Sequence, residues 1–468
     1  MITVNELFSG IGAQASALQR LGIPHKIIHT SDIDKDAVLS YAAVHCGLTD
    51  EIINTYVDYP TREQMAKELT EINLGYDFKE NKPYNWFKYL NRKTKYIERY
   101  WLACKLSKNI GDISKIQNLD YADFWTYSFP CQSISIAGRQ EGIIQGETRS
   151  GLLYEVQRLL ETAKRNNTLP KYLMLENVKN LVGKKFKPQF DEWIKWLDEL
   201  GFNTYHQVLN AKDYGIPQNR ERVFAISVRK DIDNGKFTFP KPFDNGIRLI
   251  NVLDNVVEDK YYLNKDITKR FITSKNSKNS LFFDSCQVGR EGKSREYNDF
   301  APTLTSRDYK DPRLVNQTIC CAQIQSIDKS INNTREIEYA NCITAREDRG
   351  ISNRKAEGTA VIIQKSHGFN KGGIFENCPS ITTSSWQENN FMQTVELQEN
   401  IRIRKLTPKE CWRLMGFTDE QFAKARSVCS DSQLYKQAGN SIVVDVLYYI
   451  FANLFEVDVE NFTQPQQE

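Results

Sequence analysis

Apolar residues in the first half of the chain follow two alternating spacings, and this pattern predicts an α/β fold. Short runs rich in β-branched and aromatic residues predict strands, and longer stretches with apolar residues on one helical face predict helices. We expect strands at residues 3–8, 25–30, 125–128, 172–176, 205–210 and 223–228, and helices ending at residue 21 and spanning 34–45 and 152–163. Because strands that alternate with helices favour parallel pairing, the expected fold class is a doubly wound, mainly parallel sheet.

After residue 230 the chain becomes polar, which indicates a second domain. Residues 237–243 contain two prolines and predict a linker, and the stretch from there to about residue 400 holds only short strand-like runs. Three similar stretches recur at a period of about forty residues, which favours repeated β units. They are residues 301–305, 340–344 and 378–382. Recognition loops and structural turns both fit this repeat.

A helical pattern returns near the end of the chain. Thr407 and Pro408 predict a helix start, because threonine caps the first turn and proline suits its first position. The apolar run at residues 441–455 predicts a last helix that returns to the first domain. The expected organisation is a first domain at residues 1–240, a smaller β-rich domain at 241–400, and C-terminal helices at 401–468.

An insertion at about residues 50–108 interrupts the α/β pattern. Trp86, Ile97 and Trp101 lie at near-helical spacing, with lysines and arginines among them. One interpretation is an amphipathic helical segment packed on the domain. The other is a contact with the DNA backbone, since interleaved aromatic and basic residues also suit a nucleic acid.

The composition limits the possible partners. The chain has 468 residues and a formal net charge of +3, so it can bury a large core, and any nucleic-acid surface must be local. Its 10 cysteines are scattered without Cys-x-x-Cys pairs, which indicates reduced thiols and no metal site. We find no signal-peptide pattern and no apolar run of membrane-spanning length, so we expect a cytoplasmic protein without membrane contact.

Three kinds of polar group lie at the edges of predicted strands and together suit nucleophilic attack on an electron-poor ring. Cys131 stands in a Ser-Phe-Pro-Cys-Gln segment, where Pro130 fixes the backbone just before the thiol. Glu176 ends a later strand, and Arg220 and Arg222 precede an apolar run. Each feature alone also fits ordinary packing, as a buried thiol, a turn cap or a solvated ion pair.

A glycine-dotted turn follows the first strand and suggests a cofactor site. Residues 8–13 read Phe-Ser-Gly-Ile-Gly-Ala, and glycines there allow a ligand to approach the backbone closely. Asp32 ends the next strand, where a carboxylate can bind two ribose hydroxyls of a dinucleotide or of S-adenosylmethionine. The Pro-Cys segment favours S-adenosylmethionine. Asp112 precedes the cysteine strand and could lie against an adenine amino group.

In this order, the segments resemble the DNA cytosine-5 methyltransferase family of bacterial and phage restriction-modification systems. The similar blocks are residues 6–13, 128–142, 175–180, 211–224, 404–417 and 435–444. The resemblance implies an S-adenosyl-L-methionine cofactor, with the Phe8 ring against adenine and Asp32 on the ribose. The insertion between Asp32 and Asp112 departs from the family pattern. The implied cofactor-binding residues are Phe8, Gly10, Gly12, Asp32, Ile33, Asp112, Ile113, Pro130, Asn440 and Ser441.

The resemblance also implies the reaction, which is methyl transfer to carbon 5 of a cytosine flipped out of double-stranded DNA. Cys131 would add to carbon 6, Glu176 would donate a proton to ring N3, and Arg222 would stabilise the carbonyl at carbon 2. Arg220 suits a phosphate contact or the anchoring of a loop. The implied catalytic residues are Cys131, Glu176, Asn177, Arg220 and Arg222.

DNA recognition is expected in the domain at residues 241–400 and in the loop after the cysteine. The implied DNA-binding residues are Gln132, Ser133, Gln140, Thr303, Thr305, Arg307 and Arg346. We expect a stand-alone, monomeric enzyme, with a cognate restriction endonuclease as a separate partner. Two alternatives are an RNA cytosine-5 methyltransferase, such as a transfer-RNA modifier, and a non-catalytic, sequence-specific DNA-binding homologue.

Overall fold

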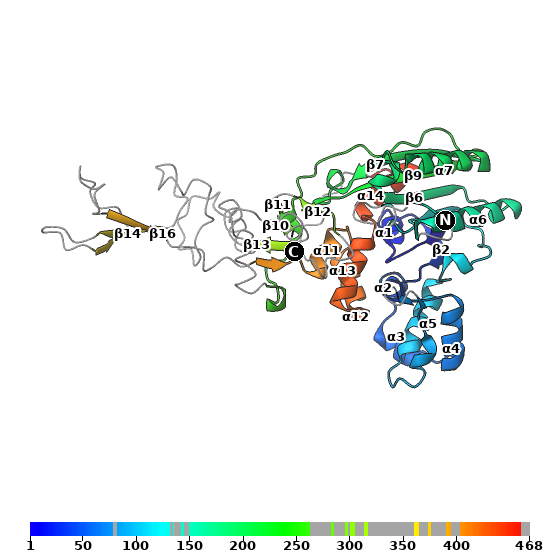
Figure 1. Cartoon of the computed structure of the whole chain (residues 1–468), viewed down its shortest axis with the longest axis horizontal. Helices are drawn as coiled ribbons and strands as arrows, with labels where there is room; N and C mark the ends of the chain where they lie inside the picture. The colour runs from blue at the N-terminus through cyan, green and yellow to red at the C-terminus, as the bar shows by residue number, and fades with distance from the viewer. Residues whose placement is uncertain are drawn as a thin grey trace. The chain divides into compact units, whose positions relative to one another are not determined.

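The structure is a computed structural model whose contacts divide the chain into two units (Figure 1). The first unit comprises Met1–Val252, Asp299–Lys310 and Pro408–Glu468, and the second comprises Leu253–Asn298 and Asp311–Thr407. The structure describes residues 1–77, 82–131, 134, 142–144, 149–262, 282–284, 295–297, 300–304, 313–316, 360–364, 373–375, 390–394 and 403–459. In this described part, no helix is both long enough and apolar enough to cross a bilayer.

A mixed sheet forms the centre of the first unit, with the strand order β2-β1-β5-β6-β9-β7. Its strands are β1 (Ile2–Leu7), β2 (His25–Ser31), β5 (Phe124–Tyr127), β6 (Tyr172–Val178), β7 (Phe202–Asn210) and β9 (Glu221–Arg229). The pairings from β2 through β6 are parallel, and β9 is antiparallel to both of its neighbours. The predicted strands are present, and the predicted mainly parallel sheet is confirmed.

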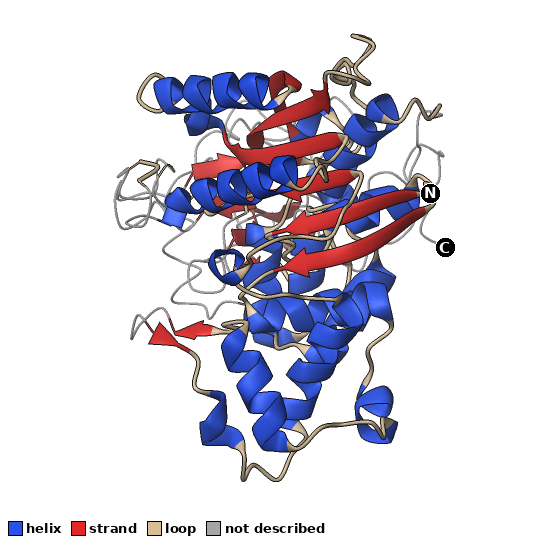
Figure 2. Ribbon diagram, turned by 90° about the vertical axis from the view of Figure 1, so that its right-hand side faces the viewer, coloured by secondary structure: helices blue, strands red, loops and turns tan. Residues whose placement is uncertain are grey.

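Helices cover both faces of this sheet because successive strand residues point to opposite sides. Trp125 and Tyr127 pack into an apolar cluster with residues of α6 (Leu153–Arg165) and α7 (Lys187–Leu200). Phe124, directly before Trp125, faces the other way and meets Phe451 of α14 (Val444–Leu454) edge to face, with ring centroids 5.4 Å apart. Figure 2 shows the strands with helices in front of and behind them. Helix α1 (Ala13–Arg20) packs against α14.

The insertion folds as a helical layer against α2 (Lys35–Cys46). Its elements are α3 (Asp50–Thr55), α4 (Arg62–Glu71), β3 (Tyr76–Asp77), β4 (Lys82–Pro83), η1 (Trp86–Tyr89) and α5 (Tyr96–Ser107). The expected amphipathic pattern is therefore divided between the short 3₁₀ turn η1 and the helix α5. Trp86 is fully buried and donates from Nε1 to the carbonyl of Leu74 at 2.8 Å.

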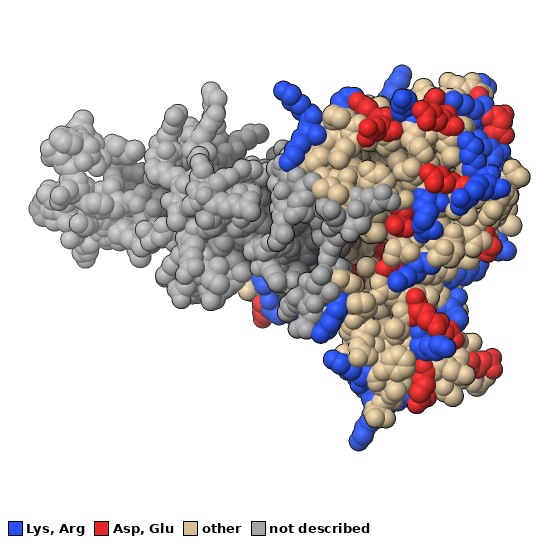
Figure 3. All heavy atoms as spheres, turned by 45° about the vertical axis from the view of Figure 1, so that its right-hand side comes forward, with Lys and Arg blue, Asp and Glu red and all other residues tan. Residues whose placement is uncertain are grey.

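Basic residues of the insertion lie over its own aromatic rings. The guanidinium carbon of Arg92 is 4.3 Å from the Tyr96 ring centroid, and the Lys95 ammonium is 5.1 Å from that of Tyr59. These cation–π contacts favour the packing interpretation over the DNA-contact one. On the face that Figure 3 displays, positive and negative side chains are interspersed, in keeping with the small net charge.

The C-terminal helices of the first unit are α11 (Pro408–Arg413), α12 (Asp419–Val428), α13 (Asp431–Asn440) and α14. Helix α12 packs on α2, and α11 packs on α13. The short 3₁₀ turns are η2 (Ile113–Lys115), η3 (Arg149–Leu152), η4 (Lys179–Val182), η5 (Ala211–Asp213), η6 (Leu249–Val252) and, in the second unit, η7 (Asp259–Tyr261).

The described strands of the second unit are all antiparallel. One sheet has the order β11-β10-β13-β17 and another the order β15-β14-β16. Their bounds are β10 (Phe282–Asp284), β11 (Arg295–Tyr297), β13 (Arg313–Asn316), β14 (Ala360–Gln364), β15 (Gly373–Phe375), β16 (Asn390–Thr394) and β17 (Ile403–Lys405).

The predicted second domain at residues 241–400 differs from the division of contacts in three stretches: residues 241–252 and 299–310 belong to the first unit, and residues 401–407 belong to the second. Strand β12 (Ala301–Pro302) pairs in parallel with β8 (Gln218–Asn219), so Asp299–Lys310 belongs to the first unit. The backbone amide of Ala301 donates to the carbonyl of Pro217 at 2.8 Å. Of the three similar stretches, the structure describes only residues 301–304; the other two lie outside the described residues.

Candidate active site

The cysteine lies in a turn whose carbonyl groups are bound by side chains. Strand β5 ends at Tyr127, and Cys131 follows in a half-buried position. Three carbonyl oxygens accept side-chain hydrogen bonds: Phe129 from Asn177 at 3.0 Å, Pro130 from Ser150 at 2.8 Å and Ile134 from Asn180 at 2.6 Å. The geometry thus gives Asn177 a supporting contact with the turn that carries the thiol.

Glu176 and Arg222 form an ion pair beside this turn. They lie on the neighbouring antiparallel strands β6 and β9, and Arg222 Nε is 3.2 Å from Glu176 Oε1. The Glu176 carboxyl group is buried, and the Arg222 side chain is partly exposed. Burial favours the protonated form of the Glu176 carboxyl group, and the adjacent cation of Arg222 favours its ionised form.

Burial controls the protonation of both the acid and the thiol. It raises the pKa of Glu176, and the positive charges of Arg222 and Arg220 oppose that rise. Burial also raises the pKa of Cys131; Arg222 opposes this rise and Glu176 adds to it. The three side chains therefore share one electrostatic environment. The raised pKa favours the thiol form of Cys131 over the thiolate.

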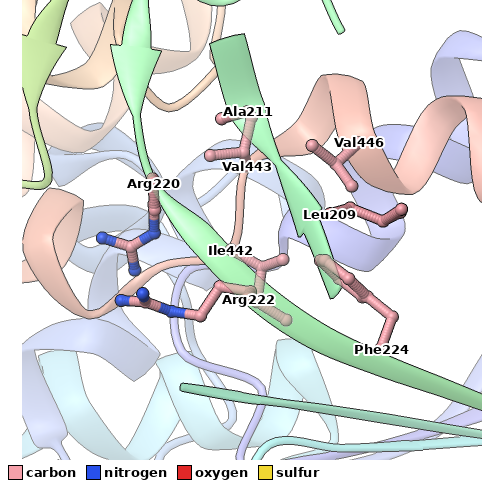
Figure 4. A pocket seen from close by; sticks show the side chains of 8 residues that line it. All are labelled: Leu209, Ala211, Arg220, Arg222, Phe224, Ile442, Val443 and Val446. Carbon is pink, nitrogen blue, oxygen red and sulfur yellow. The ribbon is translucent and has the colours of Figure 1, made fainter. Parts of the chain in front are cut away.

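Arg220 is buried and binds main-chain carbonyls. Its guanidinium donates to Leu304 at 3.0 Å, to Gly439 at 3.2 Å and to Ser441 at 2.7 Å. Of the two roles considered for Arg220, these contacts favour the anchoring of loops. Figure 4 shows its guanidinium beside that of Arg222, both pointing away from Phe224.

The cavity in Figure 4 is too small for a cofactor or a base. It has a volume of about 10 Å³ and is lined by apolar side chains and the stems of the two arginines. This volume corresponds to about one water molecule. The cavity is therefore a packing defect next to the site.

The glycine turn after β1 has an unusual backbone. Phe8, Gly10 and Gly12 have φ angles of 57°, 53° and 79°, in the left-handed region. A side chain at Gly12 would place its Cβ 2.4 Å from His45 Nε2, so only glycine fits there. The Gly10 amide donates to Asp32 Oδ2 at 2.8 Å, which joins the turn to the end of β2.

Asp32 is held at the carboxyl ends of the parallel strands. Burial and the neighbouring Asp34 raise its pKa to about 6, although the backbone amides of Asp34 and Gly10 donate to it. The Asn109 side chain binds both backbone groups of Asp32, accepting from the amide at 2.9 Å and donating to the carbonyl at 3.1 Å. Lys436 donates to Asp34 Oδ2 at 2.6 Å.

Asp112 reaches the same edge of the sheet in spite of the insertion. Ser31 Oγ donates to the carbonyl of Gly111 at 2.6 Å, which brings the Gly-Asp segment beside the end of β2. The Asp112 carboxylate accepts from Ser114 through Oδ1 and from Asn73 through Oδ2. The structure thus brings together the predicted residues at the glycine turn, Asp32 and Asp112.

The remaining predicted cofactor residues have varied environments. The Ile33 carbonyl accepts from the Gly75 amide at 2.7 Å, and the Ile113 side chain is buried in the core. Asn440 is exposed at the end of α13, and Ser441 follows it with its carbonyl bound by Arg220. Direct contact of these side chains with a cofactor stays a prediction.

Of the predicted DNA-binding residues, only Thr303 lies in the described part of the chain. Thr303 Oγ1 donates to the carbonyl of Asn219 at 2.6 Å, so its hydroxyl supports the first unit. The others lie outside the described residues: Gln132, Ser133, Gln140, Thr305, Arg307 and Arg346.

The sequence interpretation missed several polar residues that position the site. They are Asn73, Asn109, Ser150, Asn180 and Lys436. Only Gly111 carried a signal, because a glycine beside a functional aspartate suggests a close approach of another backbone. No local sequence pattern identifies the residue whose backbone approaches Gly111.

The donor set fits S-adenosylmethionine. A left-handed turn at residues 8–12 leaves open space next to Gly10, where an added Cβ would meet nothing within 4 Å. Asp32 and Asp112 supply carboxylate acceptors for ribose hydroxyls and for an amine. In the described residues, no group of three or more histidine, cysteine or acidic side chains could hold a metal ion.

The structure is similar to that of an Entamoeba histolytica methyltransferase, EhMeth, with a TM-score of 0.50 and 16% identity over 97% of this chain and 98% of that one. At this identity the similarity shows the fold alone. The chain has the α/β fold of the S-adenosylmethionine-dependent methyltransferases, as predicted.

The chain belongs to the C-5 cytosine-specific DNA methylase family, whose model matches residues 84–456. It is similar to the type II methyltransferase M2.ScrFI of Lactococcus lactis subsp. cremoris, with 34% identity over 97% of this chain and 99% of that protein. It is also similar to the orphan methyltransferase M.SPRI of Bacillus phage SPR, with 27% identity over 97% of both, and to the type II methyltransferase M.HhaI of Haemophilus parahaemolyticus, with 28% identity over 78% and 86%. The predicted family and enzyme class are confirmed.

Proposed function

We propose that this chain transfers the methyl group of S-adenosyl-L-methionine to carbon 5 of a cytosine flipped out of double-stranded DNA, through a covalent bond between Cys131 and carbon 6. One observation carries the proposal. Cys131 shares its electrostatic environment with the Glu176–Arg222 ion pair, and the members of that pair lie 3.2 Å apart on neighbouring strands. A nucleophile, an acid and a cation in one place match the demands of addition to a cytosine ring.

The first step is addition of the Cys131 sulfur to carbon 6 with loss of the thiol proton. Electrons from the carbon 5–carbon 6 double bond move through the ring to N3, and the protonated form of Glu176, which burial favours by raising the pKa of its carboxyl group, gives its proton to N3. Arg222 stabilises the carbonyl at carbon 2 and then pairs with the ionised Glu176. Carbon 5 becomes nucleophilic, which a free cytosine is not.

When bound, the cofactor supplies a methyl group on a sulfonium. The turn at residues 8–12 would hold its methionine part, Asp32 its ribose and Asp112 its adenine. Asn177, Ser150 and Asn180 keep the turn carrying Cys131 in place through their bonds to its carbonyls. After transfer, loss of the carbon 5 proton re-forms the double bond and expels the Cys131 sulfur.

The proposed substrate is double-stranded DNA, because the chain belongs to a DNA methylase family. We assign choice of the target sequence to the β-rich second unit, which takes in most of residues 241–400. We further propose that the enzyme acts as a monomer. A separate cognate endonuclease is proposed as a partner because M2.ScrFI and M.HhaI are named type II methyltransferases.

The proposal is tested by sequencing 5-methylcytosine in DNA from cells that express the wild type, Cys131→Ala or Cys46→Ala. Cys46 is the matched control, because it is also half-buried but lies at the end of α2. We expect methylation of one short motif with the wild type and Cys46→Ala and none with Cys131→Ala. Transfer by Cys131→Ala would falsify the nucleophile assignment. Methylated RNA with unmethylated DNA would replace the substrate.

A second experiment addresses the covalent bond. A duplex with 5-fluorocytosine at the target should trap the protein, because fluorine cannot leave as the proton does. Adduct formation is measured by denaturing electrophoresis in the presence of cofactor. Turnover on normal DNA without an adduct would exclude the addition-elimination route.

A further inference from the structure

Helix α4 of the insertion ends against the segment that carries Asp112. Gly111 has a φ angle of 74°, and a Cβ there would lie 1.9 Å from the carbonyl oxygen of Ile72, the last residue of the α4 cap. The same carbonyl accepts from the Asp112 amide at 2.9 Å. The insertion is thus in backbone contact with the edge of the candidate cofactor site.

Asn73, the next residue, holds the carboxylate of Asp112. Its Nδ2 donates to Asp112 Oδ2 at 2.6 Å, while Asp112 Oδ1 accepts from the amide and the hydroxyl of Ser114 at 2.9 and 2.8 Å. With Ser114 bound to one oxygen and Asn73 to the other, the plane of the carboxylate is set. Asn73 adopts a φ angle of 54°, which asparagine tolerates better than most residues.

The Asn73 side-chain amide offsets an unfavourable electrostatic contact between the end of α4 and the Asp112 carboxylate. The C-terminal end of a helix carries a partial negative charge, so the end of α4 disfavours a carboxylate next to it. The Asn73 amide presents a donor between the two. Its own oxygen, Oδ1, is buried and has no hydrogen-bond partner in the described part of the chain. Most buried side-chain amides pair both ends, so the bond from Nδ2 to Asp112 sets the orientation of the Asn73 amide.

We infer that Asn73 is a positioning residue for recognition of the cofactor's adenine: it directs the Asp112 carboxylate toward the exocyclic amine. The inference rests on the proposed function, in which Asp112 binds adenine. It gives the insertion a part in cofactor selection.

The test compares two ligands that differ at the recognised group. S-adenosyl-L-homocysteine carries the 6-amino group, and S-inosyl-L-homocysteine has a carbonyl oxygen in its place. Titration calorimetry of the full chain should give the wild type a preference of about a hundredfold for the adenosyl ligand, and Asn73→Gly should reduce it to about tenfold. Glycine is chosen because it keeps the left-handed backbone without strain. The KM for DNA should not change.

Asn167→Gly is the matched control. Asn167 occupies the same position after α6, with a φ angle of 55°, and is exposed. The segment after α6 leads directly into the start of β6, at the amino ends of the parallel strands. The candidate site lies at their carboxyl ends. We expect Asn167→Gly to keep the wild-type preference. Asn73→Asp, of nearly the same shape, should weaken binding of the adenosyl ligand more than Asn73→Gly, because it places two carboxylates together.

Asp112→Ala separates the two ideas. Loss of the preference in Asp112→Ala with retention in Asn73→Gly overturns the inference and leaves the proposed function intact. Retention in Asp112→Ala overturns the adenine assignment itself. A parallel loss for both ligands in Asn73→Gly shows a merely structural role and also overturns the inference.

Discussion

Burial, more than charge, sets the protonation of the candidate catalytic residues. It is the largest influence on the pKa of both Cys131 and Glu176, and it favours the neutral form of each. A neutral thiol and a neutral acid are the starting states that the proposed addition needs. Arg222 opposes both shifts, because its positive charge stabilises the thiolate form of Cys131 and the carboxylate form of Glu176. Its stabilising effect is therefore largest when both groups have lost their protons.

Cofactor affinity should fall in acid because of Asp32. Its pKa is raised to about 6, and the ionised form is the better acceptor for ribose hydroxyls. We expect S-adenosyl-L-homocysteine to bind about tenfold more weakly one pH unit below that value, measured by calorimetry between about pH 5 and about pH 8. The stability of the free protein should move the other way, since a raised acid pKa favours folding at low pH and this contribution is lost as pH rises through about 6. Asp32→Asn should flatten the binding profile; an unchanged profile in that variant assigns the titration to another group.

At the level of single residues, local sequence patterns indicate the groups that are proposed to do chemistry but not the groups that hold them. Cys131, Glu176 and Arg222 each follow or begin a strand, so their positions can be inferred from local patterns. Asn73 and Asn109 act on residues far along the chain, and their contacts depend on the fold of the insertion. Such contacts leave no periodic signal.

Among the elements, β8, β12 and α13 meet at one buried arginine. Arg220 donates to carbonyls after β12 and at the end of α13, close to Asn440 and Ser441. A lysine at this position has a single nitrogen and cannot bind three separate carbonyls in the same fork. The arginine thus ties the candidate cofactor segment to the strand that leads to Arg222.

Arg220→Lys should therefore reduce the free energy of unfolding by about 2 kcal/mol, measured with urea, because buried carbonyls lose their donors. Arg229→Lys, on the same strand run, is the control: Arg229 pairs with the exposed Asp231 and its side chain donates to only one main-chain carbonyl among the described residues, that of Leu169 at 2.8 Å, so its loss should cost less than about 1 kcal/mol. Equal losses in both variants would show that the carbonyl contacts of Arg220 contribute little.

Element prediction succeeded where spacing alone decides and failed where packing does. The strands and flanking helices of the sheet follow from alternating apolar patterns. Spacing does not reveal that β9 inserts between β6 and β7 with reversed direction. In the insertion, the polar stretch before α5 breaks the expected helical pattern, and the rings of Tyr89 and Tyr96 pack across the break with centroids 4.9 Å apart.

For the whole molecule, the two units predict separable specificity. A chimera that carries a relative's residues in place of 253–298 and 311–407 should methylate that relative's target sequence, as mapped by sequencing of 5-methylcytosine. Residues 299–310 should stay native, because Leu304 binds Arg220. A chimera with unchanged specificity would contradict the assignment of recognition to the second unit.

The domain boundaries themselves could be predicted only in outline. Composition marks the change after residue 230, but the return of residues 299–310 to the first unit depends on a two-residue pairing, β8 with β12. So short a pairing has no compositional trace. The similar stretches at 340–344 and 378–382 do not reveal which of the three would join the first unit.

The close approach of Ile72 to Gly111 limits how this enzyme can be redesigned. A shortened insertion would remove the carbonyl that receives the Asp112 amide, and a lengthened α4 would collide with the loop before β5. Residues 62–73 and 109–114 should therefore be kept together when the enzyme is redesigned for altered cofactor analogues. The same holds when this catalytic unit is transferred into a fusion protein. If Asn73 and Asp112 recognise adenine as proposed, shortening the insertion should change which nucleoside the enzyme accepts.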